Sequence, residues 1–178
     1  MNLRAKELDR KIIFRGRRFA VINSKVKIRG KEVNKQFIRH KGGPEILGIT
    51  KNGKVVLIES YRPELGGYSY ELPGGTLKKN EKPVDAARRE FEEETGYVAK
   101  KIKYMFSGYP LLGHSDSKLY FFLATDLEKR KQKLEDDESI FVKEFEPRKV
   151  FDMMKKKKIK DLCVYSAIYY YFNRKFKN

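Results

Sequence analysis

The chain has 178 residues, a formal net charge of +17, and 40% hydrophobic and 13% aromatic residues. This composition excludes a disordered chain, and the length suffices for one domain with a sizeable core. The sequence lacks an apolar run of bilayer-spanning length and a secretory signal, and its single Cys163 excludes an internal disulfide. We therefore expect a cytoplasmic protein without membrane contact, with Cys163 as a buried small hydrophobic residue of the last helix.

The positive charge is concentrated at the two ends of the chain. Residues 1–40 contain 13 Lys/Arg and three acidic residues and so carry a net charge of +10. Residues 155–178 contain eight Lys/Arg and one acidic residue and so carry +7. Basic surfaces attract nucleic acid or anionic metabolites, whereas lysine-rich surfaces also serve solubility. Because the basic residues are scattered among strand and helix patterns, we favour solubility and keep RNA as an alternative partner.

The sequence up to residue 72 predicts strands, because β-branched and aromatic residues alternate there with polar ones. Two apolar runs meet at Asn52-Gly53, which favours a hairpin with a tight primed turn. The break at residues 73–75, Pro-Gly-Gly, ends this region. The segments predicted as strands or hairpins are residues 11–28 with a turn near Gly16, 32–40, 45–62 and 68–72.

A helix is predicted next, with Pro83 in its first turn and Gly96 at its end. Three further strands and two closing helices follow, and the last helix has an apolar stripe that indicates core or a dimer interface. The order predicts an α+β domain with a mixed sheet. The strands are residues 100–109, 118–127 and 139–147, the helices are residues 148–159 and 161–176, and the stripe is Val164, Ala167, Ile168, Tyr171 and Phe172.

The helix after Pro83 contains four carboxylates within five positions, at residues 90, 92, 93 and 94. At 100° per residue, Val84, Ala87 and Phe91 share one face that would pack on the sheet, and Arg88 and Glu92 form a pair facing solvent. Glu90, Glu93 and Glu94 share a third face.

Such a cluster raises its own pKa values unless a cation neutralises it, and hard divalent cations such as Mg²⁺ or Mn²⁺ prefer oxygen ligands. Bound ions there could clamp a diphosphate and activate a water molecule. The alternative is a solvated glutamate-rich helix. The loop at Gly74-Gly75 favours the site, because glycine lets backbone approach a ligand closely. Arg89 can pair with Glu93 or with Glu81.

The spacing of these residues resembles the box of the Nudix hydrolase family. That box is Gly, five residues, Glu, seven residues, then Arg-Glu-apolar-any-Glu-Glu-any-Gly-apolar. The departures are mild, since Phe91 and Tyr97 are aromatic where aliphatic residues are usual. The residues that match are Gly75, Glu81, Arg89, Glu90, Phe91, Glu93, Glu94, Gly96 and Tyr97.

The resemblance implies a Nudix-like α/β/α sandwich and hydrolysis of a nucleoside diphosphate linked to another group, with Mg²⁺ or Mn²⁺. It implies that Glu90 and Glu94 are the main metal ligands and that Glu93 is a further ligand or base. The carbonyl of Gly74 matches another metal contact. The pair formed by Glu81 and Arg89, with Gly75, resembles the group that braces the loop against the helix.

Residues 55–75 resemble the ADP-ribose pyrophosphatase branch of that family. By this match Arg62 would face the substrate, and Glu71 would lie near the terminal ribose or the metals. A structural ion pair for Arg62, and a brace for a loop amide or an arginine for Glu71, are the alternatives. Leu112 stands where the branch usually has a proline in a substrate loop, which weakens the match to ADP-ribose without changing the reaction type.

The closing segment, residues 135–171, also resembles that branch, and a β region such as residues 1–40 commonly serves dimerisation there. We therefore expect residues 1–40 as a candidate dimerisation element of a homodimer and residues 41–178 as the Nudix domain. A downstream loop acid should assist catalysis. For His114 we favour a plain loop role, and for His40 a structural one. The candidate acids are Asp116, Glu135, Asp136, Asp137 and Glu138.

The activity expected from the sequence is hydrolysis of ADP-ribose, or a close relative, to AMP and a sugar phosphate. The alternatives are another nucleotide, namely NADH, a dinucleoside polyphosphate, a nucleotide sugar or capped RNA. A non-catalytic nucleotide- or RNA-binding module is a third reading, which the intact Arg-Glu and Glu-Glu positions disfavour.

Overall fold

The computed structural model describes residues 4–134, 136 and 138–175. These residues form two compact units. One contains the residues up to Gly42 together with Gly108–Leu119, and the other contains Gly43–Ser107 and the chain from Tyr120 onward. No helix among the described residues is long and apolar enough to cross a membrane.

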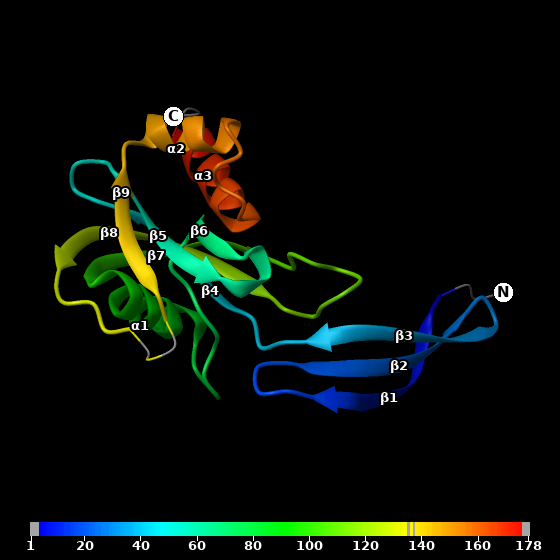
Figure 1. The fold of residues 1–178 in the computed structure, drawn as a ribbon. Helices are drawn as coiled ribbons and strands as arrows, with labels where there is room; N and C mark the ends of the chain where they lie inside the picture. Colours follow the sequence, from blue (N-terminus) through cyan, green and yellow to red (C-terminus); the bar gives the residue numbers. More distant parts are fainter. Residues whose placement is uncertain (1–3, 135, 137, 176–178) are drawn as a thin grey trace. The chain divides into compact units, whose positions relative to one another are not determined.

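The first unit is built on an antiparallel sheet of three strands in the order β1-β2-β3 (Figure 1). The strands are β1 (Lys6–Arg15), β2 (Ala20–Ile28) and β3 (Lys31–Arg39). The turn between β1 and β2 is closed by the Gly16 N–H, which donates to the Phe19 carbonyl at 2.8 Å. The predicted hairpin with a turn near Gly16 is therefore confirmed, as is the strand that follows it.

The second unit contains a six-stranded sheet in the order β6-β5-β4-β8-β7, with β9 paired to β5. Figure 1 shows α1 on one side of this sheet and α2 and α3 on the other, so the expected mixed sheet between helices is confirmed. Its strands are β4 (Gly43–Ile49), β5 (Val55–Arg62), β6 (Gly67–Glu71), β7 (Tyr97–Gly108), β8 (Leu119–Lys129) and β9 (Ile140–Phe145). Its helices are the 3₁₀ turn η1 (Pro63–Leu65), α1 (Pro83–Thr95), α2 (Pro147–Lys155) and α3 (Leu162–Lys175).

The connection between β4 and β5 differs from the tight primed turn that Asn52-Gly53 predicts. The Gly53 N–H donates to the Thr50 carbonyl and the Thr50 N–H to the Lys54 carbonyl, both at 2.9 Å. Gly53 has φ +79°, whereas Asn52 does not have a positive φ. A primed turn of type I′ needs positive φ at both central residues. That prediction is therefore wrong, and the turn is instead closed by one left-handed glycine.

Helix α1 packs on the sheet through the face that the sequence predicts. Phe91 and Ala87 are fully buried in one cluster with Ile46 of β4, and Val84 packs against it. Gly48 leaves room for the Phe91 ring, because a Cβ at that glycine would lie 2.7 Å from Phe91 Cζ. The side chains therefore fix where α1 crosses β4.

The ends and outer face of α1 refine the prediction. Gly96 ends the helix in the left-handed conformation, with φ 67°, and its N–H donates to the Glu92 carbonyl. The predicted pair of Arg88 and Glu92 is wrong. Arg88 donates instead to the Ala99 carbonyl at 2.9 Å, and the Glu92 carboxylate lies 3.9 Å from Lys133 Nζ.

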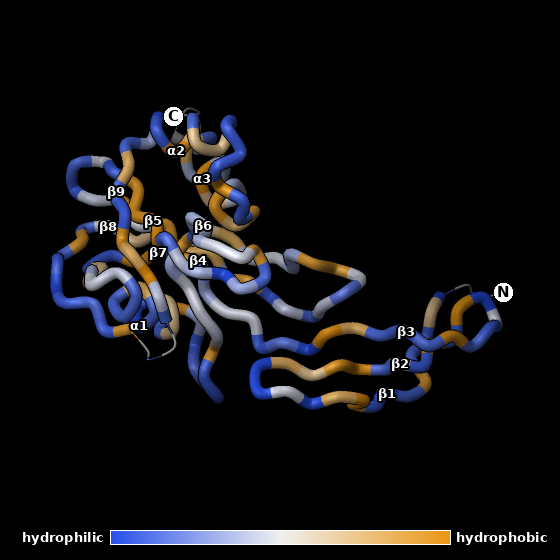
Figure 2. The backbone as a smooth tube through the Cα atoms, viewed as in Figure 1, coloured by the Kyte–Doolittle hydropathy of each residue, from blue (hydrophilic) through white to orange (hydrophobic). Residues whose placement is uncertain are grey.

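Helix α3 supplies core to the second unit. Val164, Ala167 and Ile168 are fully buried, which confirms the core half of the predicted stripe. Figure 2 shows mainly hydrophobic residues along α3 and alternating hydrophobic and hydrophilic residues along β1–β3. The buried residues of α3 therefore belong to the core of the second unit.

We predict that Phe91→Ala lowers the free energy of unfolding by about 3–5 kcal/mol, because it leaves a cavity between α1 and β4. Urea denaturation followed by circular dichroism measures this change. Glu92→Ala on the same helix is the control and should change stability by less than about 0.5 kcal/mol. A loss below about 1 kcal/mol for Phe91→Ala would show that the cluster does not hold α1 in place.

Candidate active site

Two carboxylates of α1, one helical turn apart, meet the loop that precedes the helix. Glu94 is 5% exposed, and its Oε2 accepts the Gly74 N–H at 2.7 Å. The Glu90 side chain is 12% exposed and lies against Gly75, where a Cβ would come within 2.5 Å of Glu90 Cδ. Glycine at position 75 is therefore a requirement for the close approach of Glu90.

The electrostatics of this pair favour a bound cation. Burial raises the pKa of Glu94 well above its usual range, and the charges of Glu90 and Glu138 raise it further. The hydrogen bond from the Gly74 N–H lowers this pKa but does not outweigh burial. Burial also raises the pKa of Glu90, although the hydrogen bond and charge of the neighbouring Arg89 lower it. Poorly solvated oxygen ligands of like charge suit a hard divalent cation, which restores the ionised form. The donor set of Glu90, Glu94 and the Gly74 backbone therefore fits such an ion.

Arg89 connects the loop to the helix. Its guanidinium donates to both Glu81 oxygens at 2.8 and 2.9 Å, and Glu81 also accepts the Lys78 N–H at 2.8 Å. The hydrogen bonds from Arg89, opposed by burial, lower the pKa of Glu81 to about 2. Arg89 also contacts Glu90 at 2.8 Å and Glu93 at 3.0 Å. One guanidinium therefore holds three carboxylates and the loop.

Glu93 shares Arg89 with Glu90, because Arg89 Nη1 lies 2.8 Å from Glu90 Oε1 and 3.0 Å from Glu93 Oε2. Its carboxylate accepts from Arg89, and it lines a shallow groove with Asp85, Arg88 and Lys133. The structure thus brings Glu94 to Gly74 and Glu90 to Gly75, and Arg89 joins Glu90 to Glu93. The role of Glu93 as ligand or base stays a prediction.

A cavity of about 300 Å³ begins at Gly74 and extends between the β5–β6 hairpin and the start of α3. Arg62 and Glu71 line it and bind each other, with Arg62 Nε 3.0 Å from both Glu71 oxygens and Nη2 2.5 Å from Oε2. This pairing raises the pKa of Arg62. The two residues that the sequence assigns to the substrate therefore lie in one wall, joined as an ion pair.

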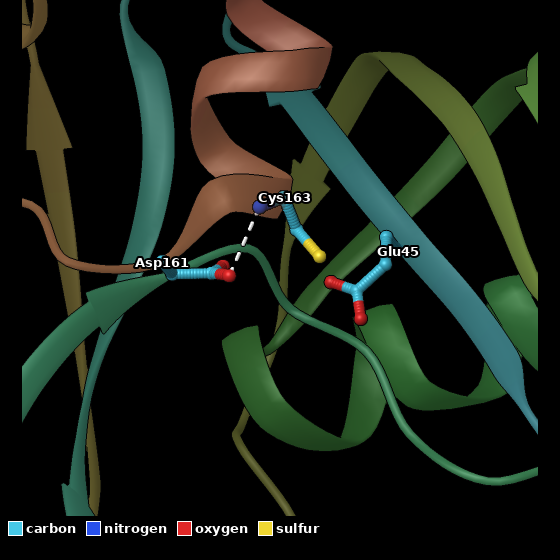
Figure 3. A group of neighbouring side chains, drawn as sticks. All are labelled: Glu45, Asp161 and Cys163. Atoms are coloured by element: carbon cyan, nitrogen blue, oxygen red, sulfur yellow. Dashed lines mark hydrogen bonds between the residues drawn. The ribbon is translucent and has the colours of Figure 1, made fainter. Parts of the chain in front are cut away.

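Three further residues of this region were missed by the sequence reasoning. Atoms of Glu45, Asp161 and Cys163 that could bind a metal lie within 4.8 Å of one another (Figure 3). Glu45 is the one charged residue of β4, and Asp161 precedes a helix and accepts the Cys163 N–H at 3.0 Å, so both had a local signal. Cys163 is only partly buried and borders two carboxylates, so the expected buried hydrophobic role is wrong.

Of the candidate downstream acids, Glu138 and Asp116 have clear surroundings. The charge of Glu138 raises the pKa of both Glu90 and Glu94. Asp116 belongs to the first unit, where its Oδ1 accepts the His40 N–H at 3.0 Å and its Oδ2 lies 3.5 Å from Arg39. Asp136 is exposed, and Glu135 and Asp137 lie outside the described residues.

Leu112 and the two histidines also belong to the first unit. Leu112 is 74% exposed on the segment Gly108–Leu119, and its predicted substrate role stays a prediction. The His114 carbonyl accepts the Ile38 N–H at 2.7 Å, and His40 Nδ1 accepts the Gly42 N–H at 3.0 Å. Both histidines thus contribute hydrogen bonds that hold the fold of this unit.

Comparison with known families shows the family to which the glutamate-rich helix belongs. The family model described as the NUDIX domain matches residues 44–165, which include the whole Gly-Glu-Arg-Glu-Glu pattern. The chain belongs to the Nudix hydrolase family. Nudix hydrolases generally depend on a divalent metal, in agreement with the donor set of Glu90 and Glu94.

Individual relatives extend beyond the family domain. An ADP-ribose pyrophosphatase of Bacillus subtilis (strain 168) is 30% identical over 172 residues, covering 95% of this chain and 93% of that protein. A methanol dehydrogenase activator of Bacillus methanolicus is 31% identical over 143 residues, which cover 79% of this chain and 77% of that protein. The crystal structure of an ADP compounds hydrolase has the same fold, with a TM-score of 0.79 and 17% identity. The match covers 95% of this chain and 92% of that chain.

The ion pair of Glu81 and Arg89 predicts a pH-dependent contribution to the stability of this Nudix hydrolase. Because the folded pKa of Glu81 is about 2 and the reference value is 4.5, the contribution is complete above pH 4.5 and is lost as pH falls toward 2. We predict that Glu81→Gln lowers the free energy of unfolding by about 2 kcal/mol at pH 6 and by less at pH 3.

Urea titrations at pH 3, 4, 5 and 6 measure this difference. Glu128→Gln, at an exposed carboxylate of β8, is the matched control and should give a curve parallel to that of the unmodified protein. Parallel curves for Glu81→Gln would refute the assigned ion pair.

Proposed function

We propose that this Nudix enzyme hydrolyses the diphosphate of ADP-ribose, or of a closely related ADP-linked sugar, to AMP and a sugar phosphate. The observation that carries the reaction type is the pair of buried carboxylates, Glu90 and Glu94, at the Gly74-Gly75 loop. The relative named an ADP-ribose pyrophosphatase, aligned over 95% of this chain, supports the choice of substrate.

In this proposal Glu90, Glu94 and the Gly74 carbonyl hold Mg²⁺ or Mn²⁺, which when bound supplies Lewis-acid stabilisation of the diphosphate charge. Arg62 binds phosphate oxygens through its planar guanidinium, and Glu71 orients it. Glu138 accepts the proton of the attacking water, because its charge acts on both metal-binding carboxylates. Glu93 is the alternative base.

The first unit is assigned a role in assembly. We infer that residues 1–40 form the dimerisation element of a homodimer and residues 41–178 the catalytic domain. Support comes from β1, which is exposed along its whole length and carries apolar side chains. Light scattering should give twice the chain mass, and a monomer at micromolar concentration would contradict this assignment. The exposed apolar side chains of β1 include Leu8, Ile12, Ile13 and Phe14.

We predict that Glu94→Gln lowers kcat about 10²- to 10³-fold, because it removes a charged oxygen ligand from the site. Circular dichroism and urea denaturation check that the fold is intact. Glu92→Gln, on the outer side of the same helix, is the control and should retain the activity of the unmodified enzyme. Near-normal turnover by Glu94→Gln would refute the metal assignment.

A hydrolysis panel tests the substrate. ADP-ribose, NADH, a dinucleoside polyphosphate, a nucleotide sugar and capped RNA are each incubated with Mg²⁺ or Mn²⁺, and products are separated by chromatography. We expect the highest kcat/KM for ADP-ribose and loss of activity with EDTA. Intact ADP-ribose after incubation with both metals would refute the proposed substrate, and salt-sensitive turnover of capped RNA would favour the RNA alternative.

A further inference from the structure

We propose that the cavity beside Arg62 receives the sugar on the far side of the diphosphate, and that Glu45 and Asp161 determine its specificity by binding the sugar hydroxyls. This inference rests on the proposed function, since it assigns a place to one half of the proposed substrate. It concerns residues outside the Nudix box.

The chemistry of the cavity wall favours a hydroxyl-rich group over a nucleobase. Among the described residues that line it, none carries an aromatic ring on which a base could stack. The wall instead presents carboxylates, a serine hydroxyl and two cationic side chains. Carboxylates accept hydrogen bonds from vicinal hydroxyls, and Lys160 or Arg62 can bind a phosphate. The polar lining residues that carry the argument are Glu45, Arg62, Ser69, Glu71, Lys160 and Asp161.

The position of the cavity fits the second half of a diphosphate substrate. Gly74 lines the cavity and is also the residue whose N–H binds Glu94. Glu45 pairs with Gly74 in an antiparallel β-bridge, so its side chain starts directly beside the metal-binding loop. A phosphate held at Glu90 and Glu94 would therefore direct its attached group into the cavity.

Glu45 and Asp161 are better candidates for sugar recognition than the other carboxylate of the wall. Glu71 already accepts three contacts from the Arg62 side chain. Asp161, in contrast, accepts the Cys163 N–H at Oδ1. Among the described residues, no side chain or backbone N–H donates to the Glu45 carboxylate. Figure 3 shows the Asp161 and Glu45 carboxylates on either side of Cys163, whose thiol points toward Glu45.

Cys163 adds no negative charge to this wall. Burial raises the pKa of its thiol, and the carboxylates of Glu45 and Asp161 raise it further, so the thiol is protonated at neutral pH. Burial also raises the pKa values of Glu45 and Asp161. The three side chains therefore form a wall of two carboxyl groups, whose oxygens accept hydrogen bonds in either protonation state, beside a neutral thiol.

Separate binding of the two expected products tests the assignment. Isothermal titration calorimetry with Mg²⁺ measures ribose 5-phosphate and AMP against the unmodified enzyme and Glu45→Gln. We expect the dissociation constant of ribose 5-phosphate to rise about tenfold in Glu45→Gln, as for the loss of one hydrogen bond, with that of AMP unchanged. Glu59→Gln on β5, paired with Lys143, is the matched control and should leave both constants unchanged.

A second variant tests whether weaker binding could result from misfolding. Asp161→Asn retains an oxygen that can accept the Cys163 N–H, so the start of α3 should persist while sugar binding weakens. Unchanged ribose 5-phosphate binding in both variants would overturn the inference, as would equal weakening of AMP. A changed Mg²⁺ or Mn²⁺ requirement with an unchanged sugar constant would assign the residues to metal binding and overturn it too.

These measurements need no turnover, so they remain distinct from the test of the proposed function. Intact ADP-ribose in the hydrolysis panel would refute the substrate, whereas absent or unselective ribose 5-phosphate binding in an enzyme that cleaves ADP-ribose would refute only the sugar cavity.

Discussion

The hydrogen bond from the Gly74 N–H to the buried Glu94 carboxylate is the contact on which the site depends. It joins the loop after β6 to the last turn of α1, at a carboxylate that is 5% exposed. The same glycine bridges to Glu45 of β4 and borders the cavity that contains Arg62. Helix α1, strand β4 and the cavity that contains Arg62 therefore meet at the backbone of Gly74.

This arrangement concentrates negative charge where water is scarce, and the fold compensates in two ways. Arg89 holds Glu81, Glu90 and Glu93 within 3.0 Å, which neutralises the outer side of the cluster and fixes the loop. The inner side keeps carboxylates whose pKa values burial raises. In the proposed site a divalent cation bound by these carboxylates would relieve that cost.

Burial of α1 against β4 gives these contacts their precision. Phe91 is followed three residues later by Glu94, so the packing of the ring over Gly48 sets the rotation of the helix and the direction of the carboxylates. A site built on a packed helix holds its geometry better than one built on loops alone. This explains why apolar and acidic residues are interleaved in so short a segment.

The sequence by itself determined the strands, the limits of α1 at Pro83 and Gly96, and the spacing that brings Glu90 and Glu94 onto one face, because these depend on local periodicity and caps. It also indicated the pairing of Glu81 with Arg89. It did not determine the turn at Gly53 or the meeting of Glu45 with Asp161 and Cys163. Only the tertiary structure decided that meeting, because packing of the sheet and helices brings β4 to the start of α3, and the local signals at Glu45 and Asp161 do not specify this contact.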